Sequence, residues 1–372
     1  MQLPYSDQLN IAAFSRLFEN KSESYKLFWF QAVLNEVCTG KTDLRYEDLI
    51  DEMIADAWYM VTEYHLNLGP KDNLERLVAY IHQTTTFLPS VKKSELLGWL
   101  SQCTDSKVRD FKNTLTKNVP YRLQSPFFDG LQFSKSLNEQ AYRINQQKRL
   151  IYYFDKISGL QTIIHVDPDW AEYLKENQEI LRGWIQYSMI IYLQRRNPSV
   201  PGISDKLYPP LERKLEKVKK FWRLLSGLQP IHEIYNGEEI TRGNISIDHF
   251  VPWSYVAHDE FWNLHPTTQR INSKKSNNLP DWEHYFPLLA GLEYRAYTLI
   301  WSSEKVNAEF HICAKEHLNN PEIKHRLYRE GLTEADFKLQ LSDVIYPIYQ
   351  SARTCGFRNW EYADEEQHDT IL

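Results

Sequence analysis

The sequence predicts a mainly α-helical protein, in which helical N-terminal and C-terminal regions surround a small core of two strands and one helix. Apolar residues recur at helical spacing in long segments near both ends, for example at 46–61 and 288–301. Between them, an apolar strand at 245–253 leads into a second short strand and a polar helix. We therefore expect four regions: helical at 1–128, mixed hairpin and helical at 129–226, the core at 227–282, and helical at 283–372.

Different sequence features predict the individual helices of the N-terminal region. The residues from Ser24 to Val37 leave few polar positions, which predicts a buried helix closed by Gly40. Asp72 is placed to cap a helix over 74–81, because its carboxylate can accept hydrogen bonds from the first backbone N–H groups. Two prolines and a glycine within 118–130 predict a loop and a boundary.

The middle region mixes strands with helices. Residues 150–154 and 160–166 are apolar and flank a short polar turn, which predicts a hairpin. After it, Asp167 is placed as an N-cap and Pro168 as the first helical residue, so helices are predicted from there to Arg196.

Charge limits the modes of nucleic-acid binding. The chain of 372 residues carries a net charge of −6, which argues against a protein that coats nucleic acid without sequence preference. Any basic groove would therefore occupy only a small part of the surface. An amphipathic helix predicted at 210–225 offers one: Lys217 and Lys220 on it are either nucleic-acid contacts or part of a solvated face. The acidic residues 364–369 predict a frayed tail.

Cysteine usage and hydropathy bear on the cellular setting. The four cysteines lie far apart and form no CxxC pair, so neither a zinc knuckle nor a disulfide framework is predicted. No window of about 18 uninterrupted apolar residues occurs, and the N-terminal residues do not resemble a signal peptide. We expect no membrane partner and a cytoplasmic location.

The core contains the polar residues that could take part in catalysis. Its first strand presents Asp248 and His249 at its end, and a second strand is predicted at 262–264. Thr267 and Thr268 then cap a helix that contains Asn272, Lys274 and Lys275. This order places an acid and a histidine from a hairpin opposite an amide from a helix, around one metal ion.

Three motifs in this core resemble the ββα-metal core of HNH endonucleases. They are Asp248-His-Phe-Val-Pro-Trp253, Trp262-Asn-Leu264 and Asn272-Ser-Lys-Lys-Ser-Asn-Asn-Leu-Pro280. Asn263 follows His249 by 14 positions and Asn272 follows it by 23, as in the subgroup that includes the HNH nuclease domain of RNA-guided CRISPR effectors. The resemblance covers residues 229–280 of the chain.

The resemblance implies which residues would hydrolyse a phosphodiester bond. Asp248 and Asn272 would be oxygen ligands of one Mg²⁺ ion, with Mn²⁺ as an alternative. His249 would be the general base, since a neutral imidazole with an ordinary pKa of about 6.5 can take a proton from water near neutral pH.

Three further residues have supporting roles in this interpretation. Asn263 would brace the loop and help to orient His249 through hydrogen bonds. Lys275, one turn beyond Asn272, would stabilise the charge on the phosphate in the transition state, or Lys274 would do so instead. Both lysines are therefore candidate nucleic-acid contacts.

The sequence departs from many HNH proteins at the positions of their structural zinc. Where those proteins carry two CxxC pairs, this chain has Glu233, Asn236, Thr268 and Ile271. No structural zinc is therefore predicted, and apolar packing must hold the core. The apolar residues expected to do so are Tyr235, Ile240, Ile247, Phe250, Trp253 and Leu264. His258 and His265 fall outside the ligand positions of the family and are expected to be structural or peripheral.

The function predicted first is a metal-dependent endonuclease that cuts DNA. The resemblance implies a stand-alone bacterial nuclease of restriction or anti-phage defence, controlled by a partner protein or a homo-oligomer through its helical flanks. Two alternatives stay open: a nucleic-acid-binding or sensing module whose nuclease core is locked or vestigial, and an RNase, because activating water does not require a 2′-hydroxyl. No readout motif in the sequence indicates a target sequence.

Overall fold

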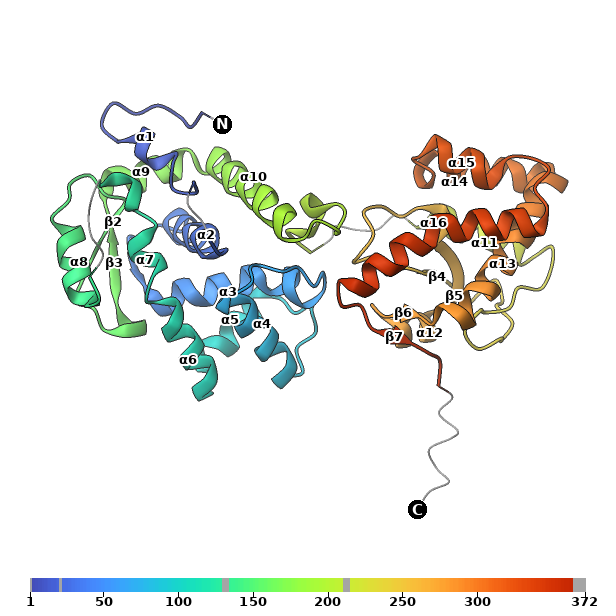
Figure 1. Cartoon of the computed structure of the whole chain (residues 1–372), viewed down its shortest axis with the longest axis horizontal. Helices are drawn as coiled ribbons and strands as arrows, with labels where there is room; N and C mark the ends of the chain where they lie inside the picture. Colours follow the sequence, from blue (N-terminus) through green and yellow to red (C-terminus); the bar gives the residue numbers. More distant parts are fainter. Residues whose placement is uncertain (1, 20–21, 129–133, 210–214, 364–372) are drawn as a thin grey trace, which may run out of the picture. The chain divides into compact units, whose positions relative to one another are not determined.

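The computed structural model describes residues 2–19, 22–128, 134–209 and 215–363 (Figure 1). It separates into two compact units: unit 1 comprises Met1–Pro198 with Lys206–Pro209, and unit 2 comprises Ser199–Asp205 with Pro210–Leu372. Helices dominate both, which confirms the mainly α-helical prediction. The division into four regions stays a prediction. The predicted helix start at 210–214 and the acidic tail at 364–369 lie outside the described residues.

Unit 1 is helical with one small sheet. Its helices are α1 (Ile11–Phe14), α2 (Tyr25–Cys38), α3 (Tyr46–Thr62), α4 (Asn73–Thr84), α5 (Lys93–Gln102), α6 (Ser106–Leu115), α7 (Val119–Arg122), α8 (Leu137–Asn145), α9 (Pro168–Glu176) and α10 (Gln178–Arg196). Its strands are β1 (Asp43–Arg45), β2 (Tyr152–Phe154) and β3 (Ile163–Val166). Short 3₁₀ turns lie at η1 (Ser125–Phe127) and η2 (Gly159–Gln161). A further 3₁₀ turn, η3 (Ile203–Lys206), has its first three residues in unit 2 and its last in unit 1.

Helix α2 forms the centre of unit 1. It packs against α3, α9 and α10, and Phe28, Trp29 and Phe30 are fully buried. The prediction of a buried helix over this segment is confirmed. Gly40 follows its end with φ of 100°, a conformation that glycine adopts without steric cost. Asp72 caps α4 as predicted, because its side chain accepts from the N–H groups of the next helix turn.

The sheet of unit 1 has the order β1-β3-β2 and is antiparallel throughout. It contains the predicted hairpin of β2 and β3, whereas β1 was not predicted. The loop predicted at 118–130 is wrong in part, because α7 and η1 lie within it. Pro120 and Pro126 each fall in the first turn of these short helices, where the missing N–H of proline removes no hydrogen bond.

A buried ion pair joins two helices of unit 1. Lys112 on α6 donates from Nζ to Asp51 Oδ1 on α3 at 2.6 Å, and both side chains are less than a tenth exposed. Burial raises the pKa of Asp51 to about 6 although the ammonium of Lys112 acts to lower it. The pair therefore depends on both partners being present in the interior.

Unit 2 carries the predicted core. Its helices are α11 (Glu216–Leu225), α12 (Gln269–Lys275), α13 (Trp282–Ser302), α14 (Glu304–His317), α15 (Pro321–Tyr328) and α16 (Glu334–Thr354). Its strands are β4 (Ile245–His249), β5 (Leu264–Thr268), β6 (Leu279–Pro280) and β7 (Asn359–Trp360), with a 3₁₀ turn η4 (Phe261–Asn263). Among the described helices of the whole chain, none combines the length and apolar character needed to cross a membrane.

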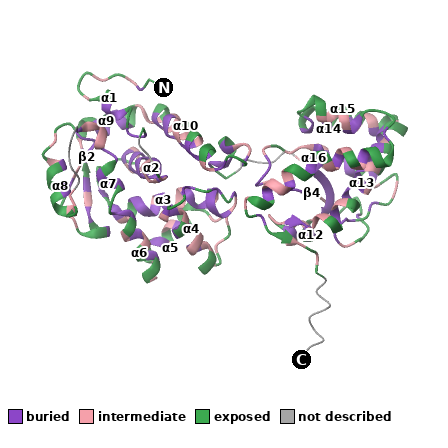
Figure 2. Cartoon of the chain, in the orientation of Figure 1, coloured by how far each residue is buried: buried purple, intermediate pink, exposed green. Residues whose placement is uncertain are grey.

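The hairpin of β4 and β5 lies at the centre of unit 2. The strands are antiparallel, α11 and α12 pack against both, and β4 is buried except at the half-buried Ser246 (Figures 1 and 2). The predicted second strand begins later than expected, at Leu264, because Trp262 and Asn263 form a 3₁₀ turn. Thr268 caps α12, as predicted, by accepting from the N–H of Ile271.

Candidate active site

The hairpin register sets the position of the two central residues. Asp248 lies opposite His265, and His249 lies opposite Leu264. Asp248 is 4% exposed and His249 is 3% exposed. Neighbouring side chains therefore enclose the strand end at which the sequence places both residues.

Three hydrogen-bonding atoms surround the carboxylate of Asp248. Lys275 Nζ lies 3.2 Å from Oδ1 and 3.1 Å from Oδ2, and the Tyr235 hydroxyl donates to Oδ2 at 3.0 Å. His265 Nε2 lies 3.4 Å from Oδ2. Burial acts to raise the pKa of Asp248, but the Lys275 ammonium and His265 outweigh it, so the pKa falls well below its usual range. The carboxylate is therefore charged at neutral pH.

Lys275 points into the hairpin. Its ammonium donates to the backbone carbonyl of His249 at 2.7 Å as well as to Asp248, and the side chain is fully buried. The adjacent Lys274 is half-buried, with Nζ 5.5 Å from the centre of the Tyr362 ring. Of the two predicted phosphate contacts, Lys275 thus faces the acid, whereas Lys274 lies beside Tyr362.

Two hydrogen bonds donated by the amide nitrogen hold the side chain of Asn272 in place. Nδ2 donates to the carbonyl of Ile247 at 3.0 Å and to Ser246 Oγ at 3.3 Å. These bonds fix the plane of the carboxamide and distinguish its nitrogen from its oxygen. Within the described residues, no hydrogen bond to Asn272 Oδ1 is formed. This oxygen is therefore an atom that could accept a ligand or a metal ion.

His249 is oriented by an aspartate that sequence reasoning did not single out. His249 Nε2 lies 2.6 Å from Asp259 Oδ1, and His317 Nδ1 donates to the backbone carbonyl of Asp259 at 2.7 Å. A carboxylate in this position favours the tautomer with a proton on Nε2. The sequence position of Asp259 does not predict this contact, because the contact depends on how the loop between β4 and β5 folds toward His249.

Asn263 clamps the loop that follows β4. Its Oδ1 accepts from the N–H of Val251 at 2.8 Å, and its Nδ2 donates to the carbonyl of the same residue at 2.9 Å. Its own carbonyl accepts from the N–H of Phe250 at 2.9 Å. The loop that carries Asp259 is thereby anchored at both ends beside His249.

Glu233 joins the segment before the hairpin to β5. One of its oxygens accepts from the N–H groups of Tyr235 and Asn236, at 2.6 and 2.9 Å, and the other accepts from the hydroxyl of Thr267 at 2.9 Å. Burial raises the pKa of Glu233, and these donors act in the opposite direction. The carboxylate therefore ties the turn at 233–236 to strand β5.

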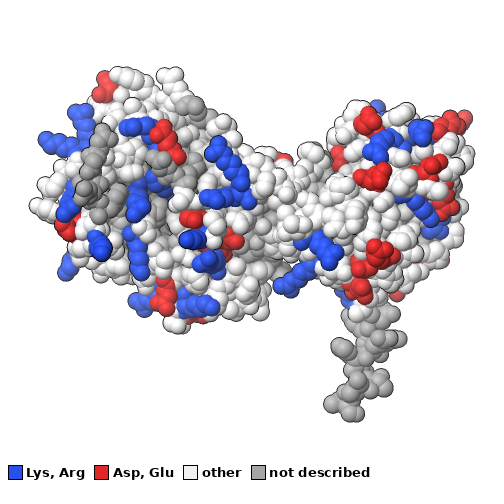
Figure 3. Space-filling view, viewed as in Figure 1, with Lys and Arg blue, Asp and Glu red and all other residues white. Residues whose placement is uncertain are grey.

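Lys217 and Lys220 occupy a different environment. On α11, Lys217 forms an ion pair with Glu316, and Lys220 pairs with Glu309 at 2.8 Å. Both acids belong to α14. In the part of the chain that the structure describes, neither lysine bonds to the residues around Asp248. On the face of unit 2 shown in Figure 3, acidic and basic side chains of the described residues are intermingled.

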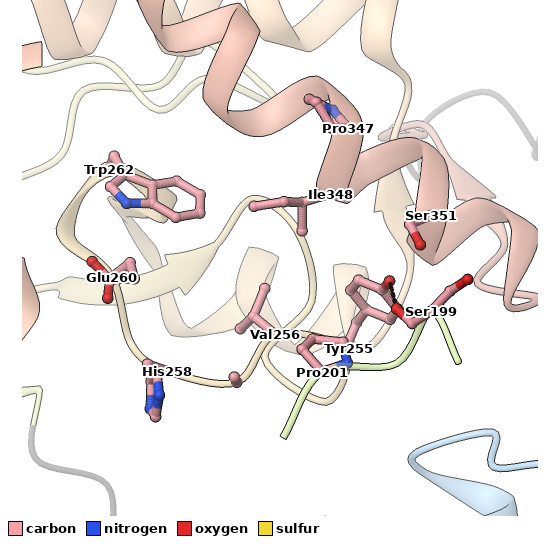
Figure 4. A pocket seen from close by; sticks show the side chains of 11 residues that line it. Ser199, Pro201, Tyr255, Val256, His258, Glu260, Trp262, Pro347, Ile348 and Ser351 are labelled. Carbon is pink, nitrogen blue, oxygen red and sulfur yellow. Dashed lines mark hydrogen bonds between the residues drawn. The ribbon is translucent and has the colours of Figure 1, made fainter. Parts of the chain in front are cut away.

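An apolar cavity of about 380 Å³ lies beside the loop between β4 and β5. Val256 and Trp262 of that loop line it together with Pro347 and Ile348 of α16 (Figure 4). The Tyr255 hydroxyl at its edge donates to the carbonyl of Ser199 at 2.7 Å. None of the residues around Asp248 lines this cavity, so it is separate from the candidate active site.

His265 and Tyr235 also belong to the site, although the sequence had placed them in structural roles. Both contact the carboxylate of Asp248, and the Tyr235 hydroxyl lies 3.2 Å from His265 Nε2. Alternation along β5 is the signal that could have found His265, since it faces Asp248 directly in the paired register. Among the described residues, no group of three or more His, Cys, Asp or Glu side chains could hold a metal ion.

Comparison with known proteins gives one match. Residues 233–281 match the family model described as HNH endonuclease. The matched segment contains Asp248, His249, Asn263, Asn272 and Lys275. No curated protein and no solved structure matches the chain. The likeness to the subgroup of CRISPR effectors stays a prediction.

Proposed function

We propose that this chain is a metal-dependent endonuclease that hydrolyses phosphodiester bonds in DNA, because residues 233–281 match the HNH endonuclease family. The observation that supports this most directly is the convergence of a charged acid, an oriented histidine and a fixed carboxamide at one end of the β4–β5 hairpin. These are Asp248, His249 and Asn272.

His249 is the proposed general base. With Nε2 facing Asp259 at 2.6 Å, the Nδ1 atom is the one that would accept a proton from water. The oxygen of that water bonds to phosphorus while the bond from phosphorus to the sugar oxygen breaks. The departing oxygen takes a proton, so one water molecule is consumed for each bond cut.

Nucleases of this family generally use a divalent metal ion. Asp248 and Asn272 fit the role of ligands, because the acid is charged and Asn272 Oδ1 accepts no hydrogen bond from the described residues. Only two protein oxygens suit an ion such as Mg²⁺ or Mn²⁺ that keeps several of its waters. When bound, the ion would neutralise charge on the scissile phosphate.

Lys275 is proposed to position the acid. Its ammonium touches both oxygens of Asp248 and the carbonyl of His249, so it fixes the strand end from which both residues project. Contact with a phosphate would require it to leave this enclosed position. Lys274 is therefore the proposed phosphate contact on α12.

The test is cleavage of supercoiled, linear and single-stranded DNA and of RNA, each with Mg²⁺ and with a chelator. The proposal expects DNA to be cut only with the metal, by the wild type and by His258→Ala but not by His249→Ala. His258 is the control because it is an exposed histidine in the loop between β4 and β5. Cleavage that survives both chelation and His249→Ala would contradict the proposal. Cleavage of RNA but not of DNA would identify RNA as the substrate.

Burial of the site favours a second candidate function. Asp248 and His249 are almost fully enclosed, and Lys275 occupies both oxygens of the acid. This closed arrangement is what a nucleic-acid-binding or sensing module with a locked nuclease core would have. Tight binding in a mobility-shift assay without metal-dependent cleavage of any nucleic acid would favour it.

The biological setting that we propose is the bacterial cytoplasm, in restriction or anti-phage defence. A nuclease in contact with its host's own DNA needs control, and the enclosed site is compatible with a form that opens on a signal. We propose that the helical flanks transmit that signal from a partner protein or from a second copy of the chain. Removal of the residues before 129 should then change when the nuclease cuts; unchanged activity and specificity would count against this gate.

A further inference from the structure

A cavity of about 460 Å³ with a mixed polar and apolar lining lies next to the candidate active site. The turn at 232–237, helix α13 and Tyr362 line it. Tyr235 belongs both to this lining and to the cluster around Asp248, because its hydroxyl donates to Asp248 Oδ2 at 3.0 Å. A molecule in this cavity would therefore be separated from the acid by one side chain.

The rim of the cavity carries side chains that bind phosphate. Arg295 projects from α13, and His232 and His284 lie on the turn and at the start of α13. All three are exposed, and Arg295 forms no ion pair among the described residues. A guanidinium that is not neutralised by a carboxylate of the protein is suited to a phosphate group.

Aromatic rings also line the cavity. His284 is stacked on Tyr285 with ring centres 4.4 Å apart and planes inclined by 6°. Tyr362 lies near two cations of α12, since Arg270 Nη1 donates to its hydroxyl at 3.4 Å and Lys274 Nζ lies 5.5 Å from its ring. Aromatic faces beside basic side chains are typical of surfaces that bind single nucleic-acid strands.

One buried donor in the turn lacks an acceptor. Asn236 Oδ1 accepts from the N–H of Glu238 at 3.0 Å, which fixes the orientation of the carboxamide. Its Nδ2 is buried and has no hydrogen-bond partner in the part of the chain that the structure describes. A buried polar group without a partner is uncommon in folded proteins, and a carbonyl of a base or a phosphate oxygen would satisfy this one.

We propose that this cavity binds one unpaired nucleotide of the strand that is cut, next to the scissile phosphate. Its base would lie against Tyr362 and His284, and its phosphate would lie on Arg295. The volume is within the range of sites for small ligands. A base inside a duplex is stacked and paired and cannot enter, so the nuclease would prefer single-stranded or locally opened substrate. This inference rests on the proposed nuclease function.

The test measures binding by the full chain in a chelator, so that no strand is cut. The probe is a labelled single-stranded oligonucleotide of about 12 nucleotides, compared with the same sequence as a duplex and as RNA. Arg295→Gln should weaken binding of the single strand and reduce the slope of log affinity against log salt by about 0.7. Arg353→Gln, which removes an exposed arginine of α16, is the matched control and should change neither.

A second pair of variants tests the aromatic contact. Tyr362→Leu should weaken binding of the single strand about tenfold, whereas Tyr362→Phe keeps the ring and most of the affinity. Neither variant should change duplex binding as strongly. DNA and RNA probes tell which sugar the nucleotide carries.

Equal binding by the Arg295→Gln and Arg353→Gln variants would overturn the proposal, as would a loss with Tyr362→Leu no larger than with Tyr362→Phe. Equal losses for single strand and duplex would also contradict it. The proposed function is judged separately, because absence of metal-dependent cleavage refutes the nuclease and leaves the binding measurements unaffected.

Discussion

Replacing Lys275 by methionine tests the centre of the site through its stability. The substitution keeps most of the length of the side chain but removes the ammonium that touches both oxygens of Asp248 and the carbonyl of His249. Removing one partner of a buried ion pair leaves an uncompensated charge and costs about 3–5 kcal/mol. The neighbouring Lys274→Met change lies at the surface of the same helix and should cost no more than about 0.5 kcal/mol.

The measurement is urea unfolding in a chelator, with hydrogen exchange on peptides from β4 and α12 to assign the change to unit 2. The double variant Asp248→Asn with Lys275→Met removes both charges and should recover most of the lost free energy of unfolding. The reasoning is refuted if Lys275→Met unfolds like Lys274→Met, or if the double variant is no more stable than the single one.

The pH dependence of this effect has a defined sign. The pKa of Asp248 in the folded state lies below its ordinary value, chiefly because Lys275 and His265 outweigh burial. The ion pair therefore stabilises the folded state at pH values above the unfolded pKa of about 3.9. The difference between wild type and Lys275→Met should shrink as the pH falls through the lower folded pKa; a difference that grows on acidification contradicts the assignment.

Three further predictions concern other buried groups. Burial raises the pKa of Cys313 to about 12, so a thiol reagent at pH 8 should label it more slowly than the half-buried Cys103, as read by mass spectrometry of native protein; equal rates would contradict this burial. Asp51→Ala leaves Lys112 buried without its partner and should cost about 3–5 kcal/mol in urea unfolding, whereas adding Lys112→Leu should restore part of it; no recovery would contradict the pair. Asn263→Ala should cost about 1–3 kcal/mol and raise hydrogen exchange in the loop at 250–259, and unchanged exchange would show that the clamp is not needed.

The sequence predicted those parts of the core that depend on local order. The apolar run of β4, the threonine cap of α12 and the spacing of His249, Asn263 and Asn272 are properties of neighbouring residues. They therefore indicated the hairpin and helix before the structure was known. The same holds for Asp72 and Asp167, whose side chains cap the helices that follow them.

The hydrogen-bond partners of Asp248 and His249 depend on how the elements pack together, so they could not be predicted from neighbouring residues in the sequence. Lys275 was expected to face the substrate, but α12 packs on the hairpin with that position inward, where its ammonium meets Asp248. Asp259 reaches His249 only because the loop after β4 folds back under the clamp of Asn263. The start of β5 was misplaced for a related reason, since the same asparagine is held in a 3₁₀ turn by its bonds to Val251.

The most direct test of the central claim is the rate of plasmid nicking by His249→Ala relative to His258→Ala, in the same Mg²⁺ buffer. Loss of a general base lowers the rate by about 10²–10⁴-fold. We expect a ratio in that range, with the His258→Ala variant close to the wild type. Equal rates for the two variants would contradict the assignment of His249 as the base.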